Sequence, residues 1–348
     1  MRWPSIKWCL VQTLGVLYVL HFGNGRQHLQ KPDTPARSSW DTTRSTTAQI
    51  ELGRRLFSET RLSRNRRVSC ATCHSPRRAF TEGRAISEGL GNYARRRNAP
   101  SLVGVTFQRS MDWDGRAGSL EEQLDGVFSA GGDMGHSIGS ALKALVSEPT
   151  YRAAFVLAYG HTPTTGTLRR ALAAYQRTLV FNDSRFDRFY FGGDTAALSA
   201  AELRGWALFR TRANCAGCHH VLAYMSDGTP IALFSDQGFH NLGIGFQSGW
   251  MSDKGRYAVS RQRRDWGAFK TPSLRNVGLT APYMHDGSLA SLEEVVAFYV
   301  RGGTANPMLD ATIVQRTMSA EEQRDLVAFL HTLSSEQLLP TARPAKQH

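Results

Sequence analysis

The stretch Cys70-Ala71-Thr72-Cys73-His74 is a Cys-x-x-Cys-His motif, the pattern that attaches haem c to a protein chain. The two thiols add to the haem vinyl groups, and the histidine becomes the proximal ligand of the iron. The motif recurs at Cys215-Ala216-Gly217-Cys218-His219, and these four cysteines are the only ones beyond the first ten residues. A thioredoxin-like redox pair needs no such histidine, and a zinc site would need a second Cys or His pair nearby. The sequence therefore predicts two covalent haems, with His74 and His219 as proximal ligands.

Residues 1–25 predict a secretory signal peptide, because Arg2 and Lys7 precede an apolar run from Trp8 to Phe22. That run is short and interrupted for a membrane span, although an uncleaved anchor is the alternative. Residues 26–45 are polar and rich in Pro, Ser and Thr, which predicts a flexible lead. Export agrees with haem c, which bacteria assemble outside the cytoplasm. We therefore expect a periplasmic protein without stable membrane insertion once the signal is cleaved.

The 348 residues carry a formal net charge of +13, or about +11 without Arg2 and Lys7. Arginines are concentrated in runs at residues 61–67, 95–97 and 261–264. One interpretation is a docking face for an acidic protein partner, because complementary charges steer encounters. The other is a solvated surface with some arginines that bind haem propionates. No nucleic-acid-binding motif accompanies the charge, so we expect no nucleic-acid partner.

The spacing of apolar residues predicts a mainly α-helical protein. Two capping-box signatures, Ser199 with Glu202 and Ser319 with Glu322, mark the starts of helices in the second half. Earlier helices are expected from Thr47 and at residues 120–127, 139–147 and 167–181.

The expected organisation has six parts, since the length suits about two domains and residues 182–194 contain Gly192-Gly193, typical of a connection. These parts are a signal peptide (1–25), a flexible lead (26–45), an N-terminal haem domain (46–182), a linker (183–195), a C-terminal haem domain (196–338) and a loose tail (339–348).

An internal repeat relates the two halves. Asn98-Ala99-Pro100-Ser101-Leu102 corresponds to Lys270-Thr271-Pro272-Ser273-Leu274, and Ser119-Leu120-Glu121-Glu122 to Ser291-Leu292-Glu293-Glu294. The residue numbers of the matching segments differ by the same amount in both pairs. The same difference also relates Asp114-Gly115 to Asp286-Gly287. We therefore expect two tandem cytochrome c-like haem domains of common origin.

The repeat allows the two iron sites to be compared. Tyr299 lies on the apolar face of the helix predicted at residues 292–299, so its side chain should point inward. Its counterpart at the same offset is Val127. A phenolate can bind ferric iron and a valine cannot, which predicts a six-coordinate second iron and an open first iron. The alternatives are that Tyr299 is a core aromatic with a satisfied hydroxyl, or that Met251, Met284 or Met308 is the ligand.

An open iron beside a saturated one predicts peroxide chemistry at the first haem and electron storage at the second. Gln123 shares the inward helix face with Val127, which would bring its amide over the open iron. Asp133 is a candidate for proton transfer during O–O cleavage, although a loop or cap residue is the alternative. Trp113 is a candidate electron carrier between the haems, although a structural indole is the alternative.

Together these motifs resemble those of the bacterial dihaem cytochrome c peroxidase/MauG family, over about residues 48–335. The resemblance implies an oxidoreductase of one of two kinds. The peroxidases reduce hydrogen peroxide with electrons from small cytochromes or copper proteins. MauG uses peroxide, or oxygen plus electrons, to oxidise tryptophans in the precursor of methylamine dehydrogenase and so completes its tryptophan tryptophylquinone cofactor. The matching segments are Leu52-Gly53-Arg54-Arg55-Leu56-Phe57, Leu62-Ser63, both haem motifs, Arg97-Asn98-Ala99-Pro100, Trp113-Asp114-Gly115-Arg116-Ala117, Gln123, and Thr271 to Tyr299.

Two positions favour a MauG-like enzyme. Typical peroxidases cap the first iron with a histidine whose place falls at Leu90, and no histidine lies between His74 and His136. They also bind the second iron with Met, where Tyr299 resembles MauG.

The family further implies a calcium ion between the haems. Its ligands would be the Asn98 side chain and the carbonyl oxygens of Thr280 and Pro282, hard donors of the kind that calcium prefers.

The chain also departs from the family pattern. Asp133 replaces a Glu in the peroxide pocket, and Val127 replaces a Pro. Ala213 stands near the place of MauG's interfacial tryptophan, for which Trp206 or Trp250 is a substitute.

The sequence thus predicts an oxidoreductase that activates hydrogen peroxide and oxidises a periplasmic protein, a quinone-cofactor enzyme precursor. One alternative is a cytochrome c peroxidase supplied by a small redox protein. The other is a non-catalytic dihaem electron carrier, which would lack an open coordination site.

Overall fold

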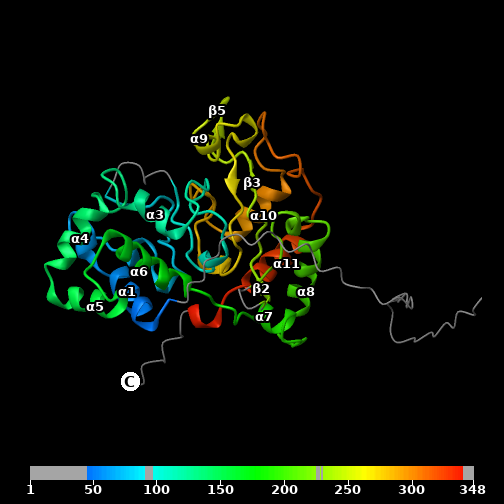
Figure 1. The fold of residues 1–348 in the computed structure, drawn as a ribbon. Helices are drawn as coiled ribbons and strands as arrows, with labels where there is room; N and C mark the ends of the chain where they lie inside the picture. Colours follow the sequence, from blue (N-terminus) through cyan, green and yellow to red (C-terminus); the bar gives the residue numbers. More distant parts are fainter. Residues whose placement is uncertain (1–44, 91–96, 225–227, 229, 340–348) are drawn as a thin grey trace, which may run out of the picture. The chain divides into compact units, whose positions relative to one another are not determined.

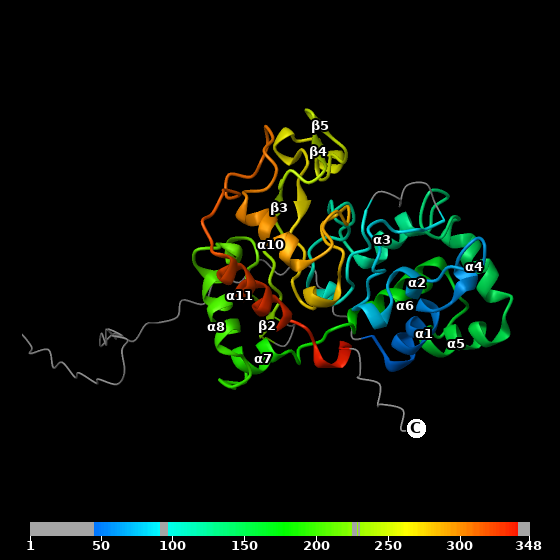
Figure 2. The same cartoon turned by 180° about the vertical axis from the view of Figure 1, so that it is seen from behind.

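The computed structural model describes residues 45–90, 97–224, 228 and 230–339. The expected signal peptide, nearly all of the expected lead and residues 340–348 of the expected tail lie outside these ranges. Figures 1 and 2 show the chain from opposite sides. Within the described ranges, no helix is both long enough and apolar enough to cross a membrane.

The first half forms a helical core in which α1 packs along α6. Gly53 allows the close approach, because a Cβ atom there would lie 1.9 Å from the carbonyl oxygen of Ala171. Leu52 and Leu56 are fully buried beside it. The helices of this half are α1 (Thr47–Phe57), α3 (Leu120–Val127), α4 (Ile138–Val146), α5 (Pro149–Tyr159) and α6 (Thr165–Arg177).

The second half forms a separate core in which α8 packs along α11. Gly205 allows these two helices to approach closely, because a Cβ atom there would lie 2.0 Å from the carbonyl oxygen of Asp325. Aromatic rings fill this core, among them Phe186, Trp206, Phe209, Phe234 and Phe329. The helices of this half are α7 (Arg185–Tyr190), α8 (Ala200–Arg210), α10 (Leu292–Val300) and α11 (Ala320–His331).

Short elements lie in the connections between these helices. They include the helical turns α2 (Cys70–Cys73) and α9 (Tyr257–Ser260). Among the residues that the structure describes, six strands form three antiparallel pairs: β1 (Leu222–Tyr224) with β2 (Pro230–Ala232), β3 (Phe239–His240) with β6 (Phe269–Lys270), and β4 (Phe246–Gln247) with β5 (Trp250–Met251). The mainly α-helical class predicted from the sequence is confirmed.

The predicted helix starts are confirmed in detail. The Ser199 hydroxyl accepts from the Glu202 N–H, and the Ser319 hydroxyl accepts from the Glu322 N–H. Thr46 caps α1 in the same way. Helix α5 lies between two expected helices and was not predicted.

The expected linker at residues 183–195 is folded rather than open. It contains α7, and Phe186 on that helix is fully buried against Trp206 at a ring-centroid distance of 5.1 Å. Asp187 is also buried and pairs with Arg275. The chain turns at Gly192, after this helix, so Phe186 and its neighbours before the turn belong to the second core.

The two halves share local geometry at positions related by the repeat offset. Isolated bridges join Met111 to Ala117 and Tyr283 to Leu289. Short 3-10 turns occupy Val105–Phe107 and Val277–Leu279, and serines cap both α3 and α10.

Direct contacts join the halves. Arg97 forms an ion pair with Asp253 at 2.7 Å, and the Asn98 N–H donates to the His285 carbonyl oxygen at 2.7 Å. The Lys270 N–H donates to the Trp113 carbonyl oxygen at 2.8 Å.

Candidate functional site

The first Cys-x-x-Cys-His motif opens onto a cavity of about 740 Å³. Cys70 and Cys73 begin and end the turn α2, and His74 follows directly. All three line the cavity. So do the other candidates of the first site and the expected calcium ligands, namely Asn98, Trp113, Gln123, Asp133, Thr280 and Pro282.

His74 is oriented to bind a metal through Nε2. Its Nδ1 lies 3.0 Å from the carbonyl oxygen of Phe80. Because a carbonyl only accepts, Nδ1 carries the proton and the Nε2 of the neutral ring is free. Burial lowers the pKa of His74, which favours that neutral form. A proximal histidine needs this arrangement.

The motif cysteines are unpaired thiols. Burial is the main factor that raises the pKa of Cys70 to about 12, that of Cys73 to about 11 and that of Cys215 to about 12. Redox-exchange cysteines have depressed pKa values and thiolate character. The environment of these thiols therefore argues against a thioredoxin-like role.

The second motif repeats this arrangement. A 3-10 turn spans Cys215–Gly217, and His219 follows Cys218. His219 Nδ1 donates to the carbonyl oxygen of Phe234 at 2.9 Å, and burial lowers the pKa of the ring. The cavity lined by Cys215 and Cys218 is smaller, about 100 Å³, and His219 lines both this cavity and the first. In both halves, two partly buried free thiols and a histidine with a free Nε2 fit the attachment of haem c.

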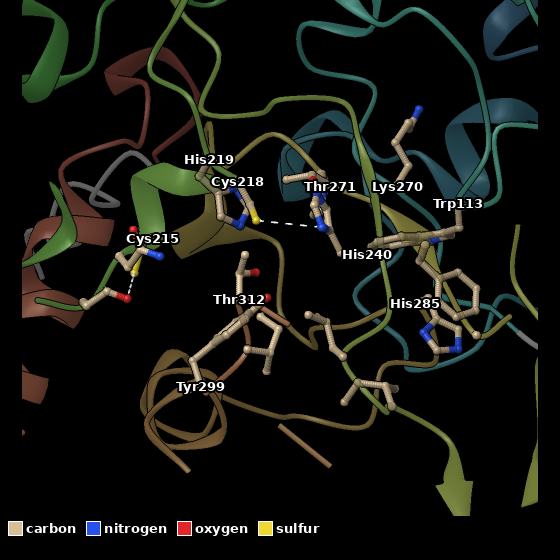
Figure 3. Close-up of a pocket in the computed structure, with 18 of the residues that line it drawn as sticks. Trp113, Cys215, Cys218, His219, His240, Lys270, Thr271, His285, Tyr299 and Thr312 are labelled. Carbon is tan, nitrogen blue, oxygen red and sulfur yellow. Dashed lines mark hydrogen bonds between the residues drawn. The ribbon is translucent and has the colours of Figure 1, made fainter. Parts of the chain in front are cut away.

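Tyr299 lines the second cavity and also reaches the first. It projects from α10 into the space that Cys218 and His219 also line (Figure 3). Burial raises the pKa of its hydroxyl, with smaller contributions from the thiols of Cys215 and Cys218. Of the alternative ligands, Met251 and Met284 line the first cavity, and Met308 lines neither in the described chain.

Gln123, Val127 and Asp133 face the first cavity together. The Asp133 Oδ1 atom is buried and has no hydrogen-bond partner among the described residues. Burial, followed by the charges of Asp112 and Glu82, raises the pKa of Asp133 to about 6. This carboxyl group therefore changes charge within the working range of most enzymes.

Asp112 is a cavity residue that the sequence analysis missed. Its Oδ1 accepts a hydrogen bond of 3.3 Å from Gln123 Nε2, and its carboxyl group lines the first cavity. The backbone has a φ of 63°, an uncommon conformation that Asp tolerates better than most residues. Met284, at the matching position of the second half, has a φ of 71°. The one available signal was an acidic residue next to Trp113.

His240 was also missed, and no motif marked it. Its two ring nitrogens lie 2.9 Å from Asp236 Oδ2 and 2.6 Å from Asp310 Oδ2. The bond to Asp236 is the main factor that raises the pKa of His240 to about 11. The protonated His240 ring, fixed between Asp236 and Asp310, therefore lines the second cavity near Cys218 (Figure 3).

Trp113 lines both cavities. Its Nε1 donates to the carbonyl oxygen of Asn98 at 2.9 Å, which orients the indole. The structure therefore places one aromatic ring beside the sites of both motifs.

The expected calcium ligands Asn98, Thr280 and Pro282 all line the first cavity. Asn98 is buried, and its Nδ2 donates to the Arg84 carbonyl oxygen at 2.7 Å. This bond directs the amide nitrogen away and leaves Oδ1 to act as a ligand. Thr280 and Pro282 line the same cavity, so the three residues fit an oxygen-donor site.

Comparisons with known proteins agree with this geometry. The family described as di-haem cytochrome c peroxidase matches residues 47–196. The methylamine utilization protein MauG of Methylorubrum extorquens is 38% identical over 84% of this chain and 79% of its own length. The cytochrome-c peroxidase IdrP1 of Denitromonas iodatirespirans is 36% identical over 83% of this chain and 82% of its own.

Solved structures extend the agreement to the fold. A MauG-like protein associated with microbial copper homeostasis aligns with a TM-score of 0.75 at 32% identity, over 85% of this chain and 92% of that one. Sequence identity over most of both chains, a shared fold and two haem-binding motifs all point the same way. The chain is an oxidoreductase of the dihaem cytochrome c peroxidase/MauG family.

Proposed function

We propose that this protein activates hydrogen peroxide at the first cavity and oxidises a partner protein, as MauG-like enzymes do. The proposal is supported most directly by the difference at matching positions: Tyr299 lines the cavity of the second motif, whereas Val127 lines only the first cavity. Val127 has no atom that can bind iron, and the described lining of the first cavity includes no histidine other than His74 and His219. One open and one saturated iron suit a division between peroxide chemistry and electron storage.

Each motif would hold one haem c. Cys70 and Cys73 would attach the first and His74 would bind its iron. In the second half the corresponding residues are Cys215, Cys218 and His219, with Tyr299 as the sixth ligand. The haems, when bound, supply the redox chemistry of O–O cleavage, and the protein supplies orientation and proton transfer.

Asp133 is the proton-transfer group in this proposal. Above a pH of about 6 its carboxylate is ionised. It can then accept a proton from one oxygen of hydrogen peroxide and return it to the other oxygen, which leaves as water. The unpartnered Oδ1 of Asp133 is the atom available for both transfers.

Asp112 positions Gln123 for the same reaction. Because Gln123 Nε2 donates to Asp112, the amide oxygen is free to accept a hydrogen bond from peroxide. Trp113 offers an aromatic route between the two sites, since it lines both cavities.

A calcium ion held by Asn98, Thr280 and Pro282 would stabilise the contact between the halves. The equal local geometry at positions related by the repeat supports two related haem domains. The family relationship favours a periplasmic enzyme with a protein substrate. The relative named methylamine utilization protein MauG makes tryptophans of a quinone-cofactor enzyme precursor the leading candidate.

The test is an electron paramagnetic resonance spectrum of the resting ferric protein, followed by addition of peroxide. We expect one high-spin, five-coordinate haem and one low-spin haem that is not His/Met. We also expect peroxide to react at once, without prior reduction.

A hydrogen peroxide-reducing peroxidase is the second candidate, because a relative named cytochrome-c peroxidase has nearly the same identity as MauG. It predicts two low-spin haems and a reaction that begins only after half-reduction. No reaction in any state would contradict both proposals.

A further inference from the structure

The three arginine runs have different structural environments. Arg97 is largely buried, at 16% side-chain exposure, and forms ion pairs with Asp253 and Asp114. Arg61 pairs with Glu148 at 3.3 Å. The third run is different, because all of its arginines are exposed and none forms an ion pair with any described residue. These are Arg261, Arg263 and Arg264.

The third run lies beside the β4–β5 hairpin, and the two are packed together. The Phe246 ring on β4 contacts the Trp266 ring at a centroid distance of 5.9 Å. The Lys254 carbonyl oxygen accepts from the Gly267 N–H at 3.0 Å. Figure 1 shows β5 and α9 next to each other.

This surface also exposes apolar side chains. Trp250 is 66% exposed and Val259 is 40% exposed. We name the surface formed by Trp250, Lys254, Val259, Arg261, Arg263 and Arg264 the basic hairpin face. An exposed aromatic ring among unpaired arginines is the composition typical of a protein-binding surface, in which Trp and Arg are the commonest anchors.

The basic hairpin face is tied to the site. Trp250 and Lys254 line the first cavity. Arg256, from the same segment, donates to the carbonyl oxygens of Asp114 at 3.0 Å and Gly115 at 2.8 Å. These residues directly follow Trp113 in the chain. A protein bound here would therefore contact residues that line the first cavity, which the Trp113 indole also lines.

We propose that the basic hairpin face is the docking surface for an acidic protein that exchanges electrons with this enzyme. Residues 246–267 contain five cations, and of their two acids Asp253 is already paired with Arg97. Carboxylates on a partner would therefore meet unpaired guanidinium groups, and an apolar patch on that partner would cover Trp250. The identity of the bound protein as a redox partner rests on the proposed function.

The chain contains its own matched control. Arg261-Gln262-Arg263-Arg264 and Arg64-Asn65-Arg66-Arg67 have the same Arg-x-Arg-Arg spacing, and all six arginines are exposed. None of the exposed large apolar side chains belongs to residues 58–75. The two triple Arg→Glu variants therefore change the net charge equally, but only one alters the basic hairpin face.

The experiment measures electron transfer in stopped flow. The holoprotein is oxidised with peroxide and mixed with reduced plastocyanin, an acidic blue-copper protein, at several sodium chloride concentrations. Ascorbate, which needs no docking surface, serves as the second reductant. For the wild type we expect a plastocyanin rate that falls as salt rises, because screening weakens steering.

The triple variant at residues 261, 263 and 264 should lose at least about tenfold of the plastocyanin rate at low salt and most of the salt dependence. The variant at residues 64, 66 and 67 should change less than about threefold. Trp250→Ala should weaken binding about tenfold while the salt dependence stays near that of the wild type. Ascorbate rates should be equal in the wild type and the two triple variants.

Equal losses in the two triple variants, or a wild-type rate with plastocyanin that is independent of salt, would overturn the docking surface. A faster reaction with a basic cytochrome c would do the same. Failure of the proposed function has a separate signature, since the wild type would then not react with peroxide before any reductant is added. Binding of plastocyanin to the resting holoprotein, measured by calorimetry, would still test the surface in that case.

Discussion

The two cavities are built from the same parts and differ in what completes them. In both, buried thiols and a histidine whose Nδ1 donates to a carbonyl oxygen form one wall. Tyr299 lines the second cavity and reaches the first, whereas Val127 and Asp133 line only the first. If Tyr299 binds iron as proposed, a single side chain at matching positions accounts for different chemistry at two similar sites.

The largest expected effect comes from removing the Tyr299 phenol. Tyr299→His should retain both haems but lower the rate of partner-protein oxidation by at least about 100-fold, because the phenolate ligand is lost. Haem content by absorbance and product formation by mass spectrometry check this. Tyr190→His, at a half-exposed tyrosine of the same half, should leave the rate unchanged. Full activity in Tyr299→His would contradict the proposed ligand.

The cores of the two halves also differ in one buried ion pair. Arg275 and Asp187 are almost fully buried and paired, whereas the position matching Arg275 in the first half is Val103. Asp187→Asn should destabilise the protein by about 3–5 kcal/mol, because it leaves an uncompensated buried charge. Guanidinium denaturation of the holoprotein checks this.

The control for that measurement is Glu148→Gln, which removes one of the two acidic partners of the half-exposed Arg61 and should cost less than about 1 kcal/mol. If both variants lost the same stability, the second core would not depend on its ion pair.

Transferring the tyrosine to the first half should close the open site. Val127→Tyr places a phenol at the position that matches Tyr299. We expect the high-spin resonance to weaken and the peroxide rate to fall about 100-fold, because the new phenol would compete with peroxide for the sixth coordination position of the iron. Val156→Tyr, on an exposed face of α5, is the control. An unchanged spectrum in Val127→Tyr would show that the two positions are not equivalent.

The smallest expected effect is a shift in pH dependence. The peroxide rate should rise as pH rises through about 6, since Asp133 accepts a proton only when ionised. Asp112→Asn removes a negative charge near Asp133 and so lowers the pKa of Asp133. The rising limb of the pH–rate profile should therefore move to lower pH. Stopped-flow rates measured across this range of pH check the prediction.

Asp125→Asn, which removes an exposed carboxylate of the same helix as Gln123, should leave the limb in place. A limb that does not move in Asp112→Asn would mean that Asp133 does not set the pH dependence.

Much of this protein can be read from local sequence. Haem attachment depends on residues within one turn, and capping boxes depend on residues three apart, so both patterns are visible without a fold. The internal repeat predicted from the sequence also allowed distant positions to be compared, because its constant offset matched Tyr299 with Val127. Those predictions required only short-range geometry or a comparison of the chain with itself.

Other features exist only in the folded chain. Asp112 reaches Gln123 through a backbone φ of 63°, and a residue name does not report that angle. The buried ion pair of Arg275 and Asp187 joins residues that are 88 positions apart. Asp187 lies in the segment that was predicted from the sequence to be a linker. The tertiary structure decided these, because burial and pairing depend on which distant segments pack together, whereas the covalent haem chemistry is written into adjacent residues.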